Sequence, residues 1–202
     1  MKYKGITAVL LAVVLFGAGC AGGPQATVNN FVLGKTDAPV QIAEYYDYQC
    51  PACKASESAV VPFIIEDYVN TGKAAITFKN MAFLGPESKI AALASLCAQE
   101  QDKFLEYHQA LFVAQGAENS GIFTNEKLRA IAAGIVLDEN SFSTCLSNGK
   151  YRDQVAQETR DASALGVDST PTFIINGQKV VGGTYLSIKR VIDKKLEEMG
   201  KK

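Results

Sequence analysis

Two cysteines, Cys50 and Cys53, stand close together with two residues between them. Thiols at this spacing can form a disulfide with each other and exchange it with thiols of another molecule. Pro51 follows the first cysteine, and proline is favoured in the first turn of a helix, where its missing N–H is not needed. A cysteine that begins a helix lies beside unpaired backbone N–H groups, which stabilise a thiolate. The pattern therefore predicts a reactive thiol at Cys50 and a more shielded partner at Cys53.

The segments on either side of the pair predict a strand followed by a helix. Residues 40–46 form an apolar run typical of a strand, and a helical pattern extends from Lys54 to about Tyr68. Pro62 lies inside this helix, where proline removes one backbone hydrogen bond and produces a kink. A Cys-x-x-Cys pair at a strand-to-helix junction is the sequence form of a thioredoxin-like redox site.

Two other interpretations of the pair stay open at this point. A static structural disulfide is one, since neighbouring helical turns can be bridged. Half of a zinc site is the other, because Cys-x-x-Cys is also a zinc-knuckle spacing. Zinc requires further ligands, but Cys97, Cys145 and His108 are isolated in the sequence. We therefore favour redox chemistry and expect no metal and no organic cofactor.

The overall composition is that of a globular protein, and its charge does not indicate binding to nucleic acids. Hydrophobic residues make up 48% of the 202 residues, which is enough for a core. The length fits one domain, or one domain with an insertion. The 20 basic and 21 acidic residues give a formal net charge of -1. Phosphate binding requires clustered Lys and Arg, so we expect no nucleic-acid partner.

The first residues read as a targeting segment rather than as part of the fold. Lys2 and Lys4 give a positive start, and the apolar stretch 6–16 is too short to span a bilayer as a stable helix. Small residues then precede Cys20. This arrangement resembles a bacterial lipoprotein signal over residues 1–19, in which Cys20 would become acylated.

One position departs from that signal. Gly17 stands where such signals usually carry Leu or another aliphatic residue, so secretory cleavage without acylation remains an alternative. Either way, we expect export from the cytoplasm. Residues 20–35, which include Gly22, Gly23 and Pro24, read as a flexible tether before a domain at 36–202.

The chain has five cysteines. Setting Cys20 aside leaves four, which allow three disulfide connectivities. If Cys50 pairs with Cys53, the remaining partnership is Cys97 with Cys145, and an exported compartment permits such a bond.

The remainder of the chain predicts a helical block inserted between two parts that contain strands. A second strand is expected at 74–79, and five helices are expected within about 86–164. Their predicted ranges are 88–99, 102–114, 124–133, 138–147 and 150–165. A hairpin follows, with strands at 173–175 and 179–181 joined by Asn176-Gly177, and a last helix covers 185–199. This order indicates an α/β domain capped by an all-helical insertion.

Two polar residues stand out in apolar surroundings. Glu44 interrupts the strand before the cysteine pair, and it either faces water or is a half-buried acid beneath the pair. In the second case its pKa would be raised and it would accept or deliver the proton of Cys53. His108 lies among apolar residues of a predicted helix, and we expect a packed, hydrogen-bonded core histidine.

Taken together, these motifs resemble the DsbA-like thiol–disulfide oxidoreductases. The resemblance covers about residue 37 to the last helix and rests on Cys50-Pro51-Ala52-Cys53, the helical insertion, and Thr170-Pro171-Thr172-Phe173 before a hairpin. It implies a thioredoxin-like fold with an inserted helical subdomain. In such a protein Cys50 would be the exposed nucleophile and Cys53 the resolving thiol.

The resemblance also assigns roles away from the cysteine pair. Pro171 is similar to the cis-proline that faces the pair, and the backbone of Thr170 before it would pair edge-on with an extended substrate peptide. Glu44 matches the buried acid of the family. The contexts of Cys97 and Cys145 resemble a second cysteine pair found in one branch; we interpret this pair as a structural disulfide, with two buried free thiols or a second redox pair as the alternatives. The family's best-known strong oxidant has His where Ala52 stands, so we expect a less acidic Cys50 and a less oxidising disulfide.

The predicted function is therefore that of an exported oxidase that donates its Cys50–Cys53 disulfide to substrate proteins. The expected partners are exported proteins with free thiols and a membrane protein that reoxidises the pair, with the chain itself a monomer held at the membrane by lipid on Cys20. A reductase or isomerase of the same fold is an alternative, because direction depends on reduction potential and on the partner. A copper carrier or peptide-binding module is the alternative outside the enzymes.

Overall fold

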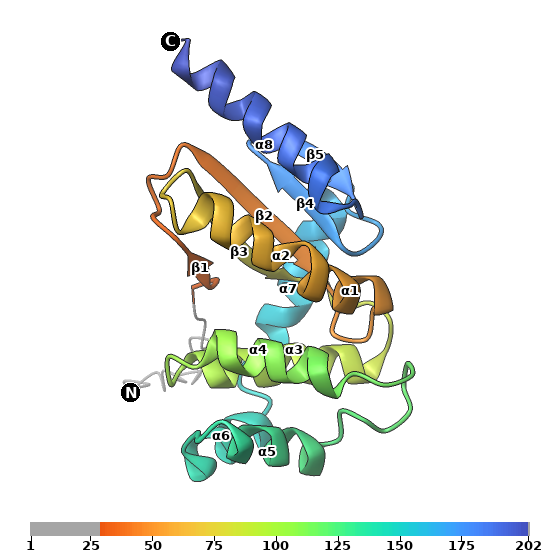
Figure 1. The fold of residues 1–202 in the computed structure, drawn as a ribbon. Coiled ribbons are helices and arrows are strands. Elements are labelled where there is room, and N and C mark those ends of the chain that lie inside the picture. The colour runs from red at the N-terminus through yellow and green to blue at the C-terminus, as the bar shows by residue number, and fades with distance from the viewer. Residues whose placement is uncertain (1–28, 202) are drawn as a thin grey trace, which may run out of the picture.

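The computed structural model describes residues 29–201. The expected signal segment and Cys20 lie outside these residues. The elements in chain order are β1 (Val32–Leu33), β2 (Val40–Tyr46), α1 (Pro51–Ala59), α2 (Val61–Ile64), the π-helical turn η1 (Ile65–Val69), β3 (Ala74–Asn80), α3 (Pro86–Gln99), α4 (Phe104–Ala114), α5 (Asn125–Gly134), α6 (Glu139–Ser147), α7 (Arg152–Ala164), β4 (Thr172–Ile175), β5 (Gln178–Val181) and α8 (Tyr185–Gly200). Figure 1 shows their arrangement.

The strands form one five-stranded sheet with the order β1-β3-β2-β4-β5. The neighbours β2 and β3 are parallel, whereas every other pairing is antiparallel. Strand β2 is therefore central, and it leads directly into the loop and helix that carry the cysteine pair. This position explains why five of its seven residues are buried.

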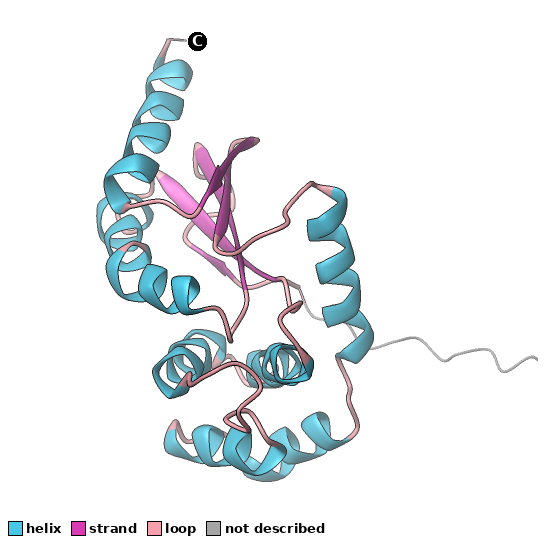
Figure 2. Ribbon diagram, turned by 90° about the vertical axis from the view of Figure 1, so that its right-hand side faces the viewer, coloured by secondary structure: helices cyan, strands magenta, loops and turns pink. Residues whose placement is uncertain are grey.

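Side chains of β2 alternate between two cores, as the strand period requires. Val40, Ile42 and Tyr46 belong to the main core, whereas Ala43 and Tyr45 pack with a smaller cluster on the other side. Figure 2 shows the two layers: α1, α2 and α8 cover one face of the sheet, and α7 covers the other. The cysteine-bearing helix therefore packs on the face that carries the main core.

The helical insertion lies at one end of the sheet. Helices α3, α4, α5 and α6 pack together there, below the sheet in Figure 1, and α7 returns the chain to the sheet. Buried aromatic side chains fill this junction, among them Phe104 and Phe112 of α4 and Phe78 of β3. The α/β fold with an inserted helical subdomain is confirmed.

The helix after the cysteines is kinked. The backbone leaves helical geometry at Val60 (φ -127°, ψ -59°), between α1 and α2. Pro62 lies two residues further on. Its backbone nitrogen carries no hydrogen, so it cannot donate a hydrogen bond to the preceding turn. The continuation into the π-helical turn η1 was not predicted.

Strand β1 also differs from what the sequence predicts. Val32 and Leu33, inside the segment expected to be a tether, pair antiparallel with Thr77 and Ile76 of β3. Phe31 adds ring contacts with Phe78 and Phe104. A two-residue strand carries too little periodicity to be recognised, and its pairing with β3 depends on the folded sheet.

Within the described residues, no helix has the length and apolar character needed to cross a membrane.

Candidate active site

Cys50 occupies the N-cap position of α1, directly after the loop that follows β2. Its side chain is 7% exposed, whereas that of Cys53 is 0% exposed. Cys50 is therefore the more accessible of the two cysteines. The exposure is smaller than that of the open nucleophile expected from the sequence, because the loop at Thr170 lies against Cys50.

Cys50 has a stabilised thiolate. A hydrogen bond from the Cys53 thiol lowers the pKa of Cys50 from 9.0 to about 6, with smaller contributions from the Thr170 side chain and the backbone N–H groups of Cys53 and Ala52. Burial acts in the opposite direction. The pKa of Cys53 is raised, first by burial and then by the bond it donates to Cys50. At neutral pH the reduced pair therefore holds one thiolate, on the sulfur that can be reached.

The loop carrying Thr170 and Pro171 faces the pair. The Thr170–Pro171 peptide bond is cis, and the Thr170 carbonyl oxygen lies 3.2 Å from the Sγ of Cys50. The Thr170 hydroxyl has no other hydrogen-bond partner among the described residues. It is thus free to donate to a thiolate. The structure brings Cys50, Cys53, Thr170 and Pro171 together at one place.

An apolar groove runs from this place along α1. It has a volume of about 350 Å³ and is lined by Pro171, by small residues of α1 such as Ala52 and Ala55, and by residues 182–185. Gly182 and Gly183 line it without side chains. An extended peptide could lie in such a groove with apolar side chains against α1.

Asp47 anchors the loop that presents Cys50. Its Oδ1 accepts hydrogen bonds from the Gln49 backbone at 2.8 Å and from the Ser88 hydroxyl at 2.6 Å. Its Oδ2 accepts from the backbone N–H groups of Phe83 and Leu84. The carboxylate therefore fixes the active-site loop to the segment that enters the helical insertion.

Gln115, at the end of α4, holds the same loop from the other side. Its Nε2 donates to the carbonyl oxygens of Tyr48 at 2.7 Å and Cys50 at 3.0 Å. Neither Asp47 nor Gln115 was recognised from the sequence. Asp47 had a weak signal, as an acidic residue next to an apolar strand, but nothing in the sequence indicates that Gln115 returns to the site.

Glu44 lies beneath α1, on the main-core face of β2. It is 0% exposed, so it is deeper than the half-buried position expected, and it does not face water. Neither carboxyl oxygen has a hydrogen-bond partner among the described residues. Burial, reinforced by the nearby charge of Glu57, raises the pKa of Glu44 well above its usual value. Burial therefore favours the protonated, neutral form of Glu44.

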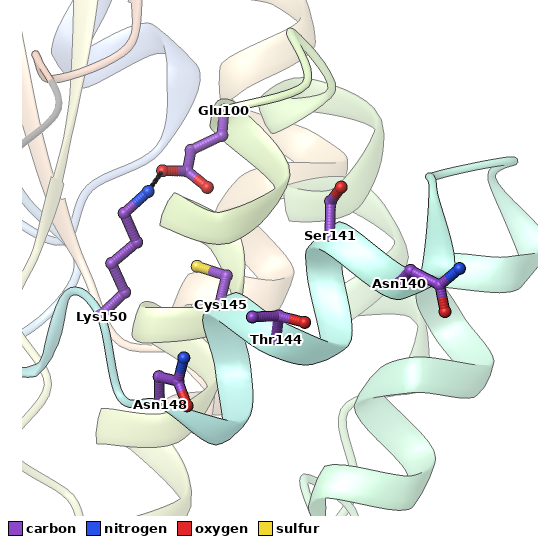
Figure 3. A pocket seen from close by; sticks show the side chains of 7 residues that line it. All are labelled: Glu100, Asn140, Ser141, Thr144, Cys145, Asn148 and Lys150. Carbon is purple, nitrogen blue, oxygen red and sulfur yellow. Dashed lines mark hydrogen bonds and ion pairs between the residues drawn. The ribbon is translucent and has the colours of Figure 1, made fainter.

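The other two described cysteines are bonded to each other and are not part of this site. A disulfide joins Cys97 of α3 to Cys145 of α6, with an S–S distance of 2.02 Å and a Cα–Cα distance of 5.8 Å. Figure 3 shows Cys145 beside an open depression of about 640 Å³, where Glu100 and Lys150 form an ion pair. This depression is larger than the groove beside Pro171. Its cysteine, Cys145, is however held in a disulfide and is only 4% exposed. We therefore place the reactive centre at Cys50.

His108 is packed in the core, and it is hydrogen-bonded. It is 0% exposed, and its Nδ1 lies 2.9 Å from the Tyr48 hydroxyl. Rings of Tyr46, Phe104 and Phe112 surround it. Within residues 29–201, no cluster of three or more His, Cys, Asp or Glu side chains could hold a metal ion.

A thiolate at a helix N-terminus, a second thiol beneath it and a groove beside it suit two-electron exchange of a disulfide with another thiol. Comparison with known proteins agrees. A family model described as "Thioredoxin" matches residues 26–194. A Bacillus subtilis protein named disulfide bond formation protein D is 31% identical over 170 residues, which cover 82% of this chain and 77% of that protein.

Solved structures point the same way. The oxidised form of BdbD from Bacillus subtilis superposes with a TM-score of 0.78 at 30% identity, covering 83% of this chain and 93% of that one. DsbA from Chlamydia trachomatis reaches a TM-score of 0.77 at 24% identity over 86% of this chain and 95% of that one, a likeness of fold alone. The chain belongs to the thioredoxin family and is a thiol–disulfide oxidoreductase. Within that class it is DsbA-like.

Proposed function

We propose that the protein is an oxidase of exported proteins, with Cys50 as the nucleophile and Cys53 as the resolving thiol. A substrate thiolate attacks the Sγ of Cys50 in the oxidised pair, and the Cys50–Cys53 bond breaks. Cys53 leaves with the electron pair and takes up one proton. A second substrate thiolate then attacks the substrate sulfur of the mixed disulfide, and Cys50 leaves as a thiolate. The substrate is oxidised by two electrons and the enzyme is reduced by two.

The observation that carries this direction is the asymmetry of the two thiols. Cys50 has a pKa of about 6, whereas the pKa of Cys53 is raised. A stabilised Cys50 thiolate favours the reduced enzyme, and this makes its disulfide a better oxidant and Cys50 a better leaving group. The names of the Bacillus relatives, which refer to disulfide bond formation, support the same direction.

The remaining parts of the cycle are proposals of the same kind. Thr170 and Pro171 would hold a substrate peptide edge-on beside the groove, and Glu44 would supply the proton that Cys53 takes up. The Cys97–Cys145 disulfide would be structural. Reoxidation would need a membrane redox partner, since the reduced pair must lose two electrons. We further propose that the chain acts outside the cytoplasm as a monomer, anchored by lipid on Cys20 after removal of residues 1–19.

Equilibration of the Cys50–Cys53 pair with glutathione tests the direction. An oxidase of this kind should have a reduction potential well above the value of about -270 mV for thioredoxin and below about -120 mV for DsbA. The lower bound follows from the stabilised thiolate, and the upper bound follows from Ala52. A potential at or below that of thioredoxin would assign the protein to the reductases instead.

Trapping tests the exchange itself. In a Cys53→Ser variant the Cys50 thiolate can still attack a disulfide of an oxidised client protein and displace one client thiolate, but no second enzyme thiol resolves the mixed disulfide, so adducts that disappear on treatment with dithiothreitol should accumulate. A Cys50→Ser variant is the matched control and should form far fewer adducts, because its remaining sulfur is buried. If neither variant forms adducts, the copper-carrier or peptide-binding alternative is favoured.

A further inference from the structure

Strand β5 forms one edge of the sheet, because β4 is its only neighbour in the strand order of the described residues. The two strands are antiparallel, and their register places Phe173 opposite Val180 and Thr172 opposite Val181. A turn of two residues, Asn176-Gly177, joins them. The residues that flank such a turn form a hydrogen-bonded pair, and hydrogen-bonded and non-bonded pairs then alternate along the strands.

This alternation determines which backbone groups of β5 are free. The N–H of Gly182 donates to the carbonyl oxygen of Pro171 at 2.7 Å, so Gly182 faces β4. Val180, two residues earlier, therefore faces β4 as well. The N–H and C=O groups of Lys179 and Val181 point the other way, out from the edge of the sheet. Among the described residues, no backbone hydrogen bond outside the helices and strands involves either of them.

Exposed apolar side chains accompany this free edge. Val181 is 55% exposed, and Leu186, in the first turn of α8, is 63% exposed. A lysine on an edge strand commonly keeps other strands away. The Nζ of Lys179, however, donates to the carbonyl oxygen of Gly166 at 2.7 Å, directly after α7. The ammonium is therefore tied to the end of α7, and the edge keeps both its backbone groups and its apolar neighbours.

The free edge continues the apolar groove beside the cysteine pair. Val181 is followed directly by Gly182 and Gly183, and both glycines line the groove together with Pro171. The edge therefore begins where this wall of the groove ends. An extended chain that leaves the groove over the glycines meets the backbone groups of Val181 first and those of Lys179 two residues later.

The shortness of β5 restricts what can occupy the edge. The strand has four residues, and only Lys179 and Val181 present outward N–H and C=O groups. Such a contact buries far less than the ~800 Å² per partner of a stable interface, which argues against a second copy of the chain. The occupant must therefore be held by another site as well. A client polypeptide joined to Cys50 meets this condition, because the mixed disulfide keeps it beside the groove.

We propose that the free edge of β5 binds the client polypeptide as an added strand while the client is joined to Cys50. The proposal rests on the proposed function and extends its client site from the groove to the edge. Main-chain hydrogen bonds supply the contact, so the edge does not select a particular client sequence. The client class is a polypeptide with an extended, unfolded segment beside its reactive cysteine.

Amide hydrogen exchange observes the added strand directly. The probe is a peptide of alternating Val and Thr residues with one cysteine, supplied as its mixed disulfide with glutathione. The Cys50 thiolate of the Cys53→Ser variant attacks the peptide sulfur, the disulfide to Cys50 forms, and glutathione leaves as a thiolate. In this complex the amides of Lys179 and Val181 should exchange at least about tenfold more slowly than in the free variant.

Two controls accompany the exchange measurement. The amide of Val180 faces β4 and should exchange slowly with or without the peptide. A peptide of the same sequence with N-methylated backbone nitrogens cannot donate main-chain hydrogen bonds, so it should leave Lys179 and Val181 unprotected. Absence of protection with the unmethylated peptide would overturn the proposal. Protection that appears without any peptide and increases with protein concentration would also overturn it, because a second copy would then occupy the edge.

Val181→Pro tests the edge during turnover. The N–H that it removes points away from β4, and proline is tolerated at such positions of edge strands. The rate of oxidation of reduced, unfolded ribonuclease A should fall about fivefold, the effect of one lost hydrogen bond. The rate with glutathione should stay that of the wild type, since this small thiol does not reach the edge.

Val181→Thr is the matched control, because it keeps the N–H and the β-branched shape of the side chain. Its rate with ribonuclease A should stay close to that of the wild type. An equal fall in both variants would attribute the effect to the side chain and overturn the main-chain contact. A wild-type rate in Val181→Pro would overturn the proposal as well. If the wild type itself oxidises neither glutathione nor ribonuclease A, the proposed function fails instead.

Discussion

The carbonyl oxygen of Thr170 lies 3.2 Å from the Sγ of Cys50, although 120 residues separate them in sequence. The contact joins the end of the helical insertion to the start of α1. Cys50 is 7% exposed, and its neighbours Ala52 and Pro171 line the apolar groove. In the reduced protein the Cys50 thiol can donate to this carbonyl oxygen, so the site of the reactive cysteine is formed by two segments that are distant in sequence.

Cys50 in the reduced protein should react with iodoacetamide as a thiolate with a pKa of about 6. Because the pKa of Cys53 is raised, one adduct rather than two should form at pH 7. The measurement is the pH dependence of the alkylation rate, followed by mass spectrometry. A single titration near 8.5, the usual value for cysteine, would contradict the thiolate that the helix and Cys53 are inferred to stabilise.

The same ionisation predicts how the stability of the reduced protein depends on pH. The folded pKa of Cys50 is depressed relative to the unfolded chain, so its contribution is complete above about pH 9 and is lost as pH falls through about 6. Urea unfolding of the reduced protein between these values should show this loss. Cys50→Ser should lack it, and equal pH slopes for the two proteins would rule it out.

Ala52→His tests why the disulfide is expected to be a moderate oxidant. An imidazolium at this exposed position would lie beside the thiolate and lower the pKa of Cys50 by about one unit. That change corresponds to an increase of about 30 mV in reduction potential. Ala52→Gln adds a polar side chain without charge and should leave the potential nearly unchanged. An equal change in both variants would attribute the effect to shape rather than charge.

The Cys97–Cys145 disulfide should behave as a structural bond. It closes a loop with a sequence separation of 48, and on the chain-entropy model this constraint stabilises the fold by about 4 kcal/mol. The double variant Cys97→Ala/Cys145→Ala should lose stability of that order in urea unfolding, yet keep its exchange with glutathione. Under mild reduction, thiol counting should give two thiols rather than four, not counting Cys20. Simultaneous reduction of both disulfides would indicate a second redox pair instead.

The sequence predicts those parts of the site that depend on local spacing. Strand 40–46, the cysteine pair at the helix start and the kink before Pro62 follow from neighbours in the chain, and the structure has each of them. Contacts that close only in the folded protein could not be predicted. Gln115 reaches the carbonyl of Cys50 only after α4 packs beside α1, and its sequence context is that of an ordinary helix end.

The same limit applies to the two acidic residues Glu44 and Glu57. Glu44 was recognised because a charged residue interrupts an apolar strand, a signal that needs no tertiary information. Glu57 gives no such signal, since polar residues are normal on a helix with one exposed face. Its contact with His108 joins positions 51 residues apart on two helices. Only the packing of α4 against α1 brings these two side chains together.

A negative charge in the groove beside Pro171 should separate protein substrates from small thiols. Ala55 is exposed on α1 and lines the groove, so Ala55→Glu adds a carboxylate to an apolar lining without filling the core. An apolar peptide segment would then lose contact area and meet a charge that it cannot pair. We expect the rate of oxidation of a reduced, unfolded protein to fall about tenfold, equivalent to about 1.4 kcal/mol of lost transition-state binding. The rate with glutathione should change little, because a small thiol needs to reach Cys50 and does not need to fill the groove.

The matched control for the groove is Ala133→Glu, an exposed alanine of α5 outside the groove. It adds the same side chain and charge to a helix, so general effects on solubility or stability should appear in it equally. Both rates should match the wild type in this control. An Ala55→Glu variant that oxidises the unfolded protein at the wild-type rate would show that clients bind elsewhere. Equal losses toward protein and glutathione would mean that the new carboxylate acts on the Cys50 thiolate itself, by raising its pKa, rather than on peptide binding.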